Sequence, residues 1–481
     1  MLKIYNTLTR RREVFKPQEG RIVKMYSCGP TVYDVPHLGN YRSFVMTDNI
    51  RRYLEYLGFE VKHVMNITDI DDKTIRRSAE EGVPLGDYTR RYEKAFFEGL
   101  RTLNVLPAHH YPRATENVDY MLKMVEDLES KGLAYERGGS VYFDVSKFQE
   151  YGKLSGIDLG KITPGARVDQ DEYDKDSPQD FALLKKSTEE EVSRGIFFES
   201  KWGKVRPGWH IECSALALKY LGPTIDIHTG GEDLIFPHHE NEIAQSESFT
   251  GKTFVRYWVH IKHLMVNGEK MSKSLGNIIT LQDLLEKYSP EVVRYMFVST
   301  HYRKTLNYTD QFAENAKSNY DRLRNAYENL LFGLATSRDD SHPSDSELLE
   351  QIERSIKEFR EAMDDDFNNP LAVGAFHNLA KAVNKYLLDA RNRSVLQKAK
   401  EAFEEMASVL GLHFPTPPSL TPEQAELVKE RERARAQKDF RRADSIREEL
   451  RKQGIILEDT EWGTKWSYDP SHASSDKSRS D

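Results

Sequence analysis

Two side chains that could bind a metal, His238 and Glu242, stand four residues apart in a segment that follows Pro237. If Pro237 opens a helix, this spacing places the imidazole and the carboxylate on one face, one turn apart. The chain of 481 residues has only two cysteines, Cys28 and Cys213, and neither has a partner close in sequence. Because thiolate, imidazole and carboxylate groups are the usual zinc ligands, we predict that these four residues meet at one metal ion. The alternative is a solvated pair of side chains on a helix surface.

The elements that would position Cys28 are a strand, a helix and a second strand. Residues 21–28 alternate and carry β-forming side chains, which predicts a strand ending at Cys28. A helix with an apolar inner face follows and stops at Gly58, and residues 60–67 predict the next strand. This order predicts a parallel βαβ unit, in which ligands bind beyond the carboxyl ends of the strands. Cys28 and the acidic segment 68–72 both fall at that edge.

Two loops could bind phosphate. Residues 36–40 open onto the predicted helix, where free N–H groups and the helix dipole favour an anion, and His37 and Asn40 could add donors. The alternative there is a turn with a capping asparagine. Residues 267–277 place two lysines and two serines between glycines, which predicts a mobile loop that could carry cations onto phosphates. By itself, such a loop is more often simply solvated.

An insertion is predicted to interrupt the sheet. Residues 139–215 contain a strand followed by glycines and acidic turns, and an apolar strand resumes at 224–231. Residues 258–266 predict one further strand. Trp209, between the insertion and the resumed sheet, is either a pocket wall or a core side chain.

Composition excludes several classes of protein. The net charge of −8 argues against a uniformly basic nucleic-acid coat, although a local basic face stays possible. Two cysteines exclude a disulfide framework and suit a reducing cytosol. No leader-like apolar region and no run of roughly 20 apolar residues is present, so we expect a cytoplasmic protein without a membrane segment.

The C-terminal third predicts helices and a small basic region. Apolar positions repeat with helical spacing over 344–413, which indicates a helical bundle. Residues 427–452 carry ten Lys or Arg and six Asp or Glu, and Trp462 and Trp466 follow. Positive charge beside exposed aromatic rings suits single-stranded RNA, whereas the alternative is a salt-bridged helix with core tryptophans. Residues 469–481 predict a disordered tail.

Several segments resemble one enzyme family. Residues 36–40, PHLGN, resemble the HIGH motif of class I aminoacyl-tRNA synthetases, and residues 270–274 match the KMSKS motif letter for letter. Four more segments resemble the cysteinyl-tRNA synthetase family: 28–34, 66–73, 206–213 and 236–242. The resemblance runs from about residue 2 to residue 468, nearly the whole chain.

The resemblance implies an α/β fold, with a class I Rossmann-type parallel sheet split by an inserted domain, then an α-helical bundle and a small α+β C-terminal module. It implies these parts: the first half of the catalytic domain (1–120), the connective insertion (121–205), the second half with the KMSKS loop (206–285), a stem-contact helical region (286–340), a DALR-type bundle (341–414), an anticodon-binding module (420–468) and the tail (469–481).

The family's zinc ligands fall on the same four residues as the prediction from residue types: Cys28, Cys213, His238 and Glu242. One zinc ion per chain is implied, and the sulfur of the substrate can become a further ligand. A hydrophobic pocket alone would reject serine by only about 1–3 kcal/mol. A direct bond from zinc to sulfur would make a separate editing domain unnecessary.

Further roles carry over by resemblance. Nucleotide binding falls on Thr31, His37, Gly39, Asn40, Lys270 and Lys273, of which His37, Asn40, Lys270 and Lys273 would assist catalysis. The amino-acid pocket falls on Gly29, Thr68, Trp209, His228 and Asp233. Asn40 stands where the motif has its second histidine; it can donate a hydrogen bond but carries no charge.

The predicted function is ATP-dependent activation of L-cysteine to cysteinyl-adenylate, then transfer to the 3′ end of tRNA(Cys), by a cytoplasmic monomer that uses ATP with Mg²⁺. One alternative is the cysteine:amino-sugar ligase of mycothiol synthesis, a family that lacks the terminal module present here at 420–468. Another is a non-catalytic RNA-binding or zinc-binding relative. A relative that had lost its enzymatic activity in evolution would be expected to lose the nucleotide-binding residues His37, Lys270 and Lys273 first, and all three are present.

Overall fold

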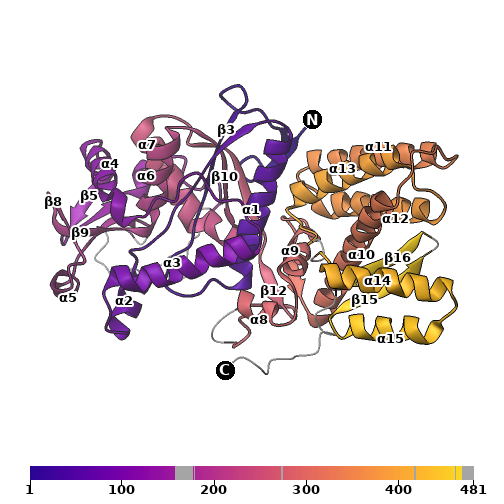
Figure 1. Cartoon of the computed structure of the whole chain (residues 1–481). Coiled ribbons are helices and arrows are strands. Elements are labelled where there is room, and N and C mark those ends of the chain that lie inside the picture. The colour runs from indigo at the N-terminus through magenta and orange to yellow at the C-terminus, as the bar shows by residue number, and fades with distance from the viewer. Residues whose placement is uncertain (158–176, 178, 272–274, 416–418, 461, 469–481) are drawn as a thin grey trace. The chain divides into compact units, whose positions relative to one another are not determined.

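The computed structural model of the chain (Figure 1) describes residues 1–157, 177, 179–271, 275–415, 419–460 and 462–468. The chain forms two compact units. The first comprises Met1–Tyr320, Lys357–Ala375 and Met406–Leu412, and the second comprises Asp321–Ile356, Phe376–Glu405 and His413–Asp481.

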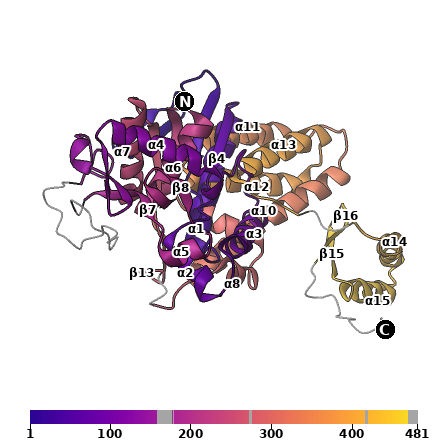
Figure 2. The same ribbon diagram turned by 90° about the vertical axis from the view of Figure 1, so that its left-hand side faces the viewer.

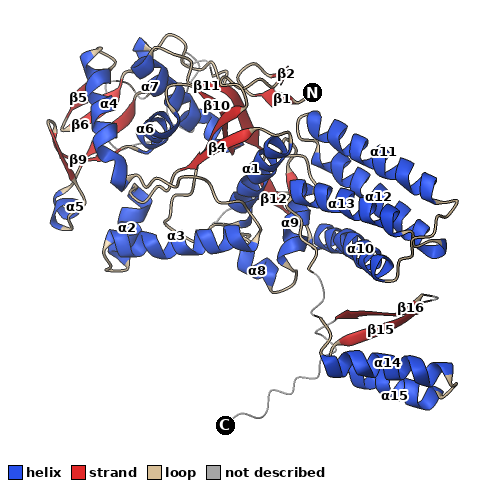
Figure 3. Ribbon diagram, turned by 45° about the horizontal axis from the view of Figure 1, so that its top comes forward, coloured by secondary structure: helices blue, strands red, loops and turns tan. Residues whose placement is uncertain are grey.

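A parallel sheet of four strands carries the edge at which the predicted ligands lie. Its strands, in the order β11-β10-β3-β4, are β3 (Ile22–Ser27), β4 (Glu60–Met65), β10 (Ile225–Gly231) and β11 (Val255–Ile261). The strands predicted near 21–28, 60–67 and 224–231 are confirmed. Helices α1 (Leu38–Tyr56) and α6 (Trp209–Leu221) lie on either side of these strands in Figure 3.

An antiparallel sheet interrupts the parallel one in sequence, as the glycine-rich segment predicted. Its order is β5-β6-β7-β9-β8, with β5 (Ala134–Arg137), β6 (Ser140–Phe143), β7 (Phe181–Lys186), β8 (Phe198–Ser200) and β9 (Gly203–Pro207). Helices α2 (Asp72–Glu80), α3 (Leu85–Thr102), α4 (Val118–Ser130) and α5 (Glu189–Ser193) accompany it. A short π-helical turn (Ile235–His239) leads into α7 (Glu240–Thr250), and β1 (Lys3–Asn6) pairs with β2 (Arg11–Val14) near the N-terminus.

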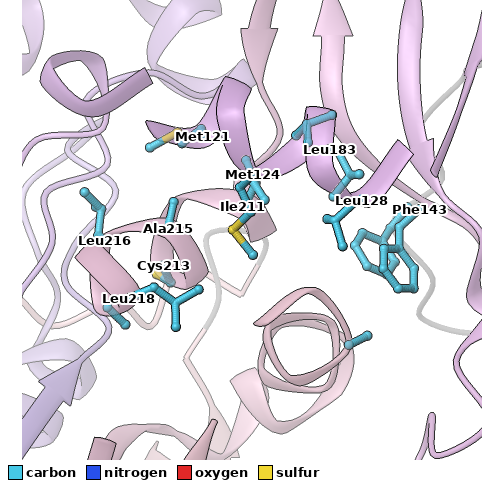
Figure 4. Packing of buried hydrophobic residues seen from close by; sticks show 14 of the residues in the cluster. Met121, Met124, Leu128, Phe143, Leu183, Ile211, Cys213, Ala215, Leu216 and Leu218 are labelled. Carbon is cyan, nitrogen blue, oxygen red and sulfur yellow. The ribbon is translucent and has the colours of Figure 1, made fainter. Parts of the chain in front are cut away.

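The helix that carries Cys213 is fixed by a hydrophobic core (Figure 4). Met121 and Met124 of α4 pack with Ile211 and Leu216 of α6, all essentially buried. Burying each large apolar side chain contributes about 1.5–3 kcal/mol, so α6 has little freedom to move. The position of the Cys213 thiol is therefore set by packing.

The single strand predicted at 258–266 is wrong. β11 ends at Ile261, and after Lys262 and His263 the chain starts β12 (Leu264–Val266) in another sheet. That sheet has the order β13-β12-β14, with β13 (Glu269–Lys270) and β14 (Leu306–Tyr308). The parallel ladder stops where its partner β10 ends, at the pair Gly231 and Ile261. Beyond it the Lys262 N–H donates to the Tyr302 carbonyl at 2.8 Å, and the carbonyls of Lys262 and His263 accept hydrogen bonds from the side chain of Arg42.

Helices make up most of the remaining chain, as the apolar repeats predicted. They are α8 (Leu281–Leu285), α9 (Pro290–Val298), α10 (Asp310–Ala335), α11 (Asp345–Asp364), α12 (Asn369–Asp389) and α13 (Arg393–Leu410). Inside the second unit the ring of Phe403 packs against Tyr327, Phe376 and Phe414, with centroids 5.2, 4.5 and 5.3 Å away. Among the described residues, none of these or the other helices combines the length and apolar character needed to cross a bilayer.

The last described elements are two helices and a hairpin (Figure 2): α14 (Pro422–Ala436), α15 (Phe440–Arg451), β15 (Ile455–Thr460) and β16 (Gly463–Tyr468). Arg431 of α14 is buried and binds both carboxylate oxygens of Asp459, at 2.7 and 2.8 Å. Trp466 packs on the small core of this region. Part of the basic run therefore forms internal ion pairs, and Trp462 and Trp466 are half-buried rather than exposed.

Candidate active site

The four residues predicted to bind zinc lie together at the carboxyl end of β3. Cys28 follows β3 directly, Cys213 lies in α6, and Glu242 lies in the first turn of α7. His238 belongs to the π-helical turn before α7, so the regular helix does not begin at Pro237 as predicted. One nitrogen, oxygen or sulfur atom from each of the four lies within 4.8 Å of those of the other three.

The separations between these atoms suit one tetrahedral zinc ion. Cys28 Sγ lies 3.8 Å from Cys213 Sγ and 3.6 Å from Glu242 Oε1, and His238 Nε2 lies 3.2 Å from Glu242 Oε1. Zinc bonds of about 2.3 Å to sulfur and about 2.0 Å to nitrogen or oxygen would separate these pairs by about 3.8, 3.5 and 3.3 Å in a tetrahedron. The donor set therefore fits zinc in both chemistry and spacing.

A second group of possible ligands shares two members with the first: Cys28, His228, His239 and Glu242. His239 Nε2 lies 3.2 Å from Cys28 Sγ but 3.8 Å from Glu242 Oε1, longer than the tetrahedral value. His228 Nε2 faces the other carboxylate oxygen, Oε2, at 2.9 Å, which is a hydrogen-bond distance. His239 Nδ1 is held by His260 Nε2 at 2.8 Å. Sequence reasoning missed His239 and His260; the adjacent histidine pair was the only available signal.

Burial sets the protonation of the first group. It lowers the pKa of His238 to about 3, so the imidazole is neutral at physiological pH, as a metal ligand must be. It raises the pKa of the Cys28 and Cys213 thiols, which therefore need a nearby cation to become thiolates. His210 Nδ1 lies 3.0 Å from His238 Nδ1, and this hydrogen bond leaves Nε2 of His238 directed at Glu242.

Two of the predicted pocket residues are tied together through Asn66. The Gly29 N–H donates to Asn66 Oδ1 at 2.7 Å, and Asn66 Nδ2 donates to Thr68 Oγ1 at 3.1 Å. A Cβ at Gly29 would lie 1.7 Å from the Asn66 carbonyl oxygen, so only glycine fits. The Thr68 hydroxyl donates in turn to Glu212 Oε2 at 2.7 Å. Glu212, a fully buried carboxyl whose pKa is raised by burial, was missed from the sequence.

Other predicted pocket residues border the ligand group. The ring of Trp209 lies 4.2 Å from that of His238, so Trp209 is a half-buried wall of this site rather than a core side chain. His228 is bound to Glu242 and stacks on Trp258, with ring centroids 4.5 Å apart. The packing holds both rings beside the atoms of the four predicted ligands.

The predicted nucleotide loop forms a capping box at the start of α1. The Asn40 N–H donates to His37 Nδ1 at 3.3 Å, and the His37 N–H donates to Asn40 Oδ1 at 3.1 Å. Asn40 thus performs a structural task at the position of the usual second histidine. Burial lowers the pKa of His37, opposed by the carboxylate of Asp233, which lies on this side of the site. Thr31 forms an isolated parallel bridge with Thr68 beside the same loop.

The two signature segments adjoin. A Cβ at Gly39 would lie 3.1 Å from Cε of Met271, the second residue of the KMSKS segment. Lys270 is exposed at the end of β13, and Lys273 lies outside the described residues. A phosphate at the N-terminus of α1 would therefore have Lys270 on a neighbouring, exposed hairpin.

Three family models match the chain. The tRNA synthetases class I (C) catalytic domain matches residues 14–318, the DALR domain matches 358–415, and the Cysteinyl-tRNA ligase anticodon binding domain matches 417–466.

Curated relatives and solved structures agree with these matches. A Cysteine–tRNA ligase from Methanosarcina acetivorans is 55% identical over 464 residues, covering 96% of this chain and 98% of the relative. One from Thermococcus gammatolerans is 47% identical over 474 residues, covering 97% and 98%. A Mycobacterium tuberculosis methionyl-tRNA synthetase in complex with methionyl-adenylate has a TM-score of 0.63 at 18% identity, covering 82% of this chain and 91% of that one. The last likeness shows the fold alone and confirms the predicted class I architecture.

Proposed function

Because the chain belongs to the class I cysteine–tRNA ligase family, we propose that a zinc ion held by Cys28, Cys213, His238 and Glu242 selects the amino acid for its reaction. The enzyme joins cysteine to tRNA at the expense of ATP. The separation of 3.8 Å between the two thiol sulfur atoms carries the proposal, because a tetrahedral zinc ion requires about that spacing. Zinc bound there supplies a Lewis acid that prefers the thiolate of cysteine to the hydroxyl of serine.

The chain's own residues would position the reactants. The cysteine carboxylate attacks the α-phosphorus of ATP, giving cysteinyl-adenylate and pyrophosphate; the terminal ribose hydroxyl of tRNA(Cys) then takes the cysteinyl group and AMP leaves. No protein nucleophile is needed, so catalysis consists of orientation and charge stabilisation. We assign ATP with Mg²⁺ to Thr31, His37, Gly39, Asn40, Lys270 and Lys273, and the amino acid to Gly29, Thr68, Trp209, His228 and Asp233.

We propose that the tRNA is recognised by a part of the chain other than the one that carries the predicted catalytic residues. We assign anticodon binding to the module at 420–468, because a family model of that description matches residues 417–466 and the stretch 427–452 carries ten Lys or Arg against six Asp or Glu. The division into parts that resemblance implied, with the insertion at 121–205 and the DALR-type bundle at 341–414, belongs to the same proposal. We also propose that the protein is a monomer in the cytoplasm, where unpaired cysteines are kept reduced.

The test is ATP–pyrophosphate exchange with cysteine and with serine, together with zinc analysis, on the wild type and Cys213→Ser. Ser214→Ala, a buried neighbour on the same helix, is the control and should retain zinc and activity. We expect exchange with cysteine only, lost together with zinc in Cys213→Ser. Exchange that persists in a zinc-free enzyme would overturn the zinc proposal. Charging of tRNA(Cys), rather than of an amino sugar, checks the acceptor.

A further inference from the structure

A buried arginine, Arg42, joins helix α1 to the backbone next to the β12–β13 hairpin, which carries Lys270. The side chain of Arg42, in the first turns of α1, has an exposed fraction of 0%. Its Nη1 donates to the carbonyls of Lys262 and His263, each at 2.6 Å, and its Nη2 donates to those of His301, at 3.3 Å, and Lys304. A planar guanidinium can hold four carbonyls in this way, whereas the ammonium group of a lysine cannot reproduce the fork.

The charge of this arginine has little direct compensation. Burial lowers the pKa of Arg42 to about 10, so the side chain stays charged at neutral pH. Within the part of the chain that the structure describes, it forms no ion pair. Glu232 favours the charged form and binds the same turn from its other side, accepting from the His263 N–H at 3.0 Å and pairing with Lys262. A buried cation is costly, so we attribute its presence to the backbone that it fixes.

The four carbonyls lie in the two segments that lead into β12 and β14, the paired strands next to β13. Lys262 and His263 lead into β12, and His301 and Lys304 precede β14, its parallel neighbour. β12 pairs with β13, and Met265 stands opposite Lys270. The fork of Arg42 therefore fixes the base of the β12–β13 hairpin, which lies beside α1 in Figure 1.

The same helix also holds the chain that returns from the loop. The Leu38 N–H, at the start of α1, donates to the carbonyl of Ile279 at 3.0 Å, and His37 forms a bridge with Thr280. Helix α1 and its N-cap therefore bind the chain both before Lys270, at residues 262–263, and after the KMSKS segment, at residues 279–280. We propose that Arg42 is a positioning residue that sets where Lys270 stands relative to His37 in the nucleotide step. This inference rests on the proposed role of Lys270 in binding ATP.

The first test compares Arg42→Lys with Arg294→Lys. Arg294 is an equally buried arginine that bonds Asp48 of α1, at 2.5 Å, and the Leu410 carbonyl, at 2.9 Å, but does not contact the hairpin. We expect Arg42→Lys to lower kcat of ATP–pyrophosphate exchange about 10-fold to 100-fold, with the KM for cysteine and the zinc content within about twofold of wild type. Arg294→Lys should lose a similar amount of Tm and keep its kcat. Equal kcat in the two variants would overturn the inference.

A double-mutant cycle with Lys270→Ala decides whether Arg42 acts through Lys270. We expect the double variant to be no slower than Lys270→Ala alone. Fully additive losses would overturn the role of Arg42 and leave that of Lys270 intact. Exchange unaffected by Lys270→Ala would instead overturn the proposed nucleotide role of the hairpin, and this inference with it. If Arg42→Lys does not fold, Glu232→Gln, which loosens the same turn from a partly exposed side, must show the same loss confined to kcat.

Discussion

Adjacent histidines offer the sharpest test of the metal site, because each belongs to one of the two groups of possible ligands found among the described residues. His238 and His239 have exposed fractions of 1% and 0%, so asparagine at either position disturbs a comparably buried site. We predict that His238→Asn loses zinc binding, whereas His239→Asn retains it. The geometry behind this is the Nε2–Oε1 distance to Glu242, which is 3.2 Å for His238 and 3.8 Å for His239.

The expected losses of zinc affinity in the two variants differ by one to two orders of magnitude. Four-ligand zinc sites bind with roughly 10–16 kcal/mol, so one ligand accounts for about 3–4 kcal/mol, or roughly 10²-fold to 10³-fold in affinity. His238→Asn should weaken binding by at least that factor. His239 contacts Cys28 Sγ at 3.2 Å as a hydrogen-bonding neighbour, and loss of such an outer partner costs about tenfold, the lower end of the usual range.

The assay is competition for zinc between each purified variant and a chelator of known affinity, at fixed pH. The absorption spectrum of the cobalt-substituted protein gives a second readout, because a site with two thiolates has stronger sulfur-to-cobalt bands than a site with one. Melting temperatures of the two variants control for unfolding. If His239→Asn binds zinc more weakly than His238→Asn, the group containing Cys213 is not the metal site, and the reasoning from tetrahedral spacing is refuted.

Three further predictions follow from the same structure. Zinc affinity should rise about 100-fold per pH unit from about pH 6 to 8, because burial keeps both thiols protonated while the imidazole, with its pKa near 3, releases no proton. Calorimetry in two buffers should find two protons released per zinc ion bound. Release of a single proton would favour the ligand group with one cysteine. Asn40→Asp keeps the acceptor for the His37 N–H and should leave Tm unchanged. The negative charge of the aspartate would repel the phosphates and should raise the KM for ATP about tenfold. An unchanged KM would show that Asn40 is not part of the nucleotide site. Arg431→Leu leaves Asp459 without its bidentate partner and should destabilise the C-terminal region by about 1–3 kcal/mol. The KM for tRNA should then rise while the rate of ATP–pyrophosphate exchange stays the same. Slower exchange would show that this region affects the chemistry directly.

The parallel strands could be predicted because their signal is local. Residues 22–27, 60–65 and 225–231 combine β-branched side chains with glycine or polar stops, and tertiary packing only reinforces that preference. The family resemblance was equally accessible, since the signature segments are contiguous, and the family models and relatives confirm it. The thiol members of the ligand group could be named because a chain with two cysteines leaves no choice.

Other features depend on contacts between distant residues. The sequence around Lys262 and His263 favours an unbroken strand, whereas in the structure distant residues bind the chain there, among them Arg42, 220 residues away from Lys262. No propensity scale contains that interaction. The choice between His238 and His239 is similar in kind, because both precede α7 and differ only in the direction that a short non-α turn gives each ring. In both cases the outcome depends on where the backbone deviates from a regular helix or strand. At Lys262 and His263, side chains from elsewhere in the fold bind the backbone at that point. Residues that fix such deviations, Arg42 above all, are therefore where substitutions should alter the chemistry without touching a substrate.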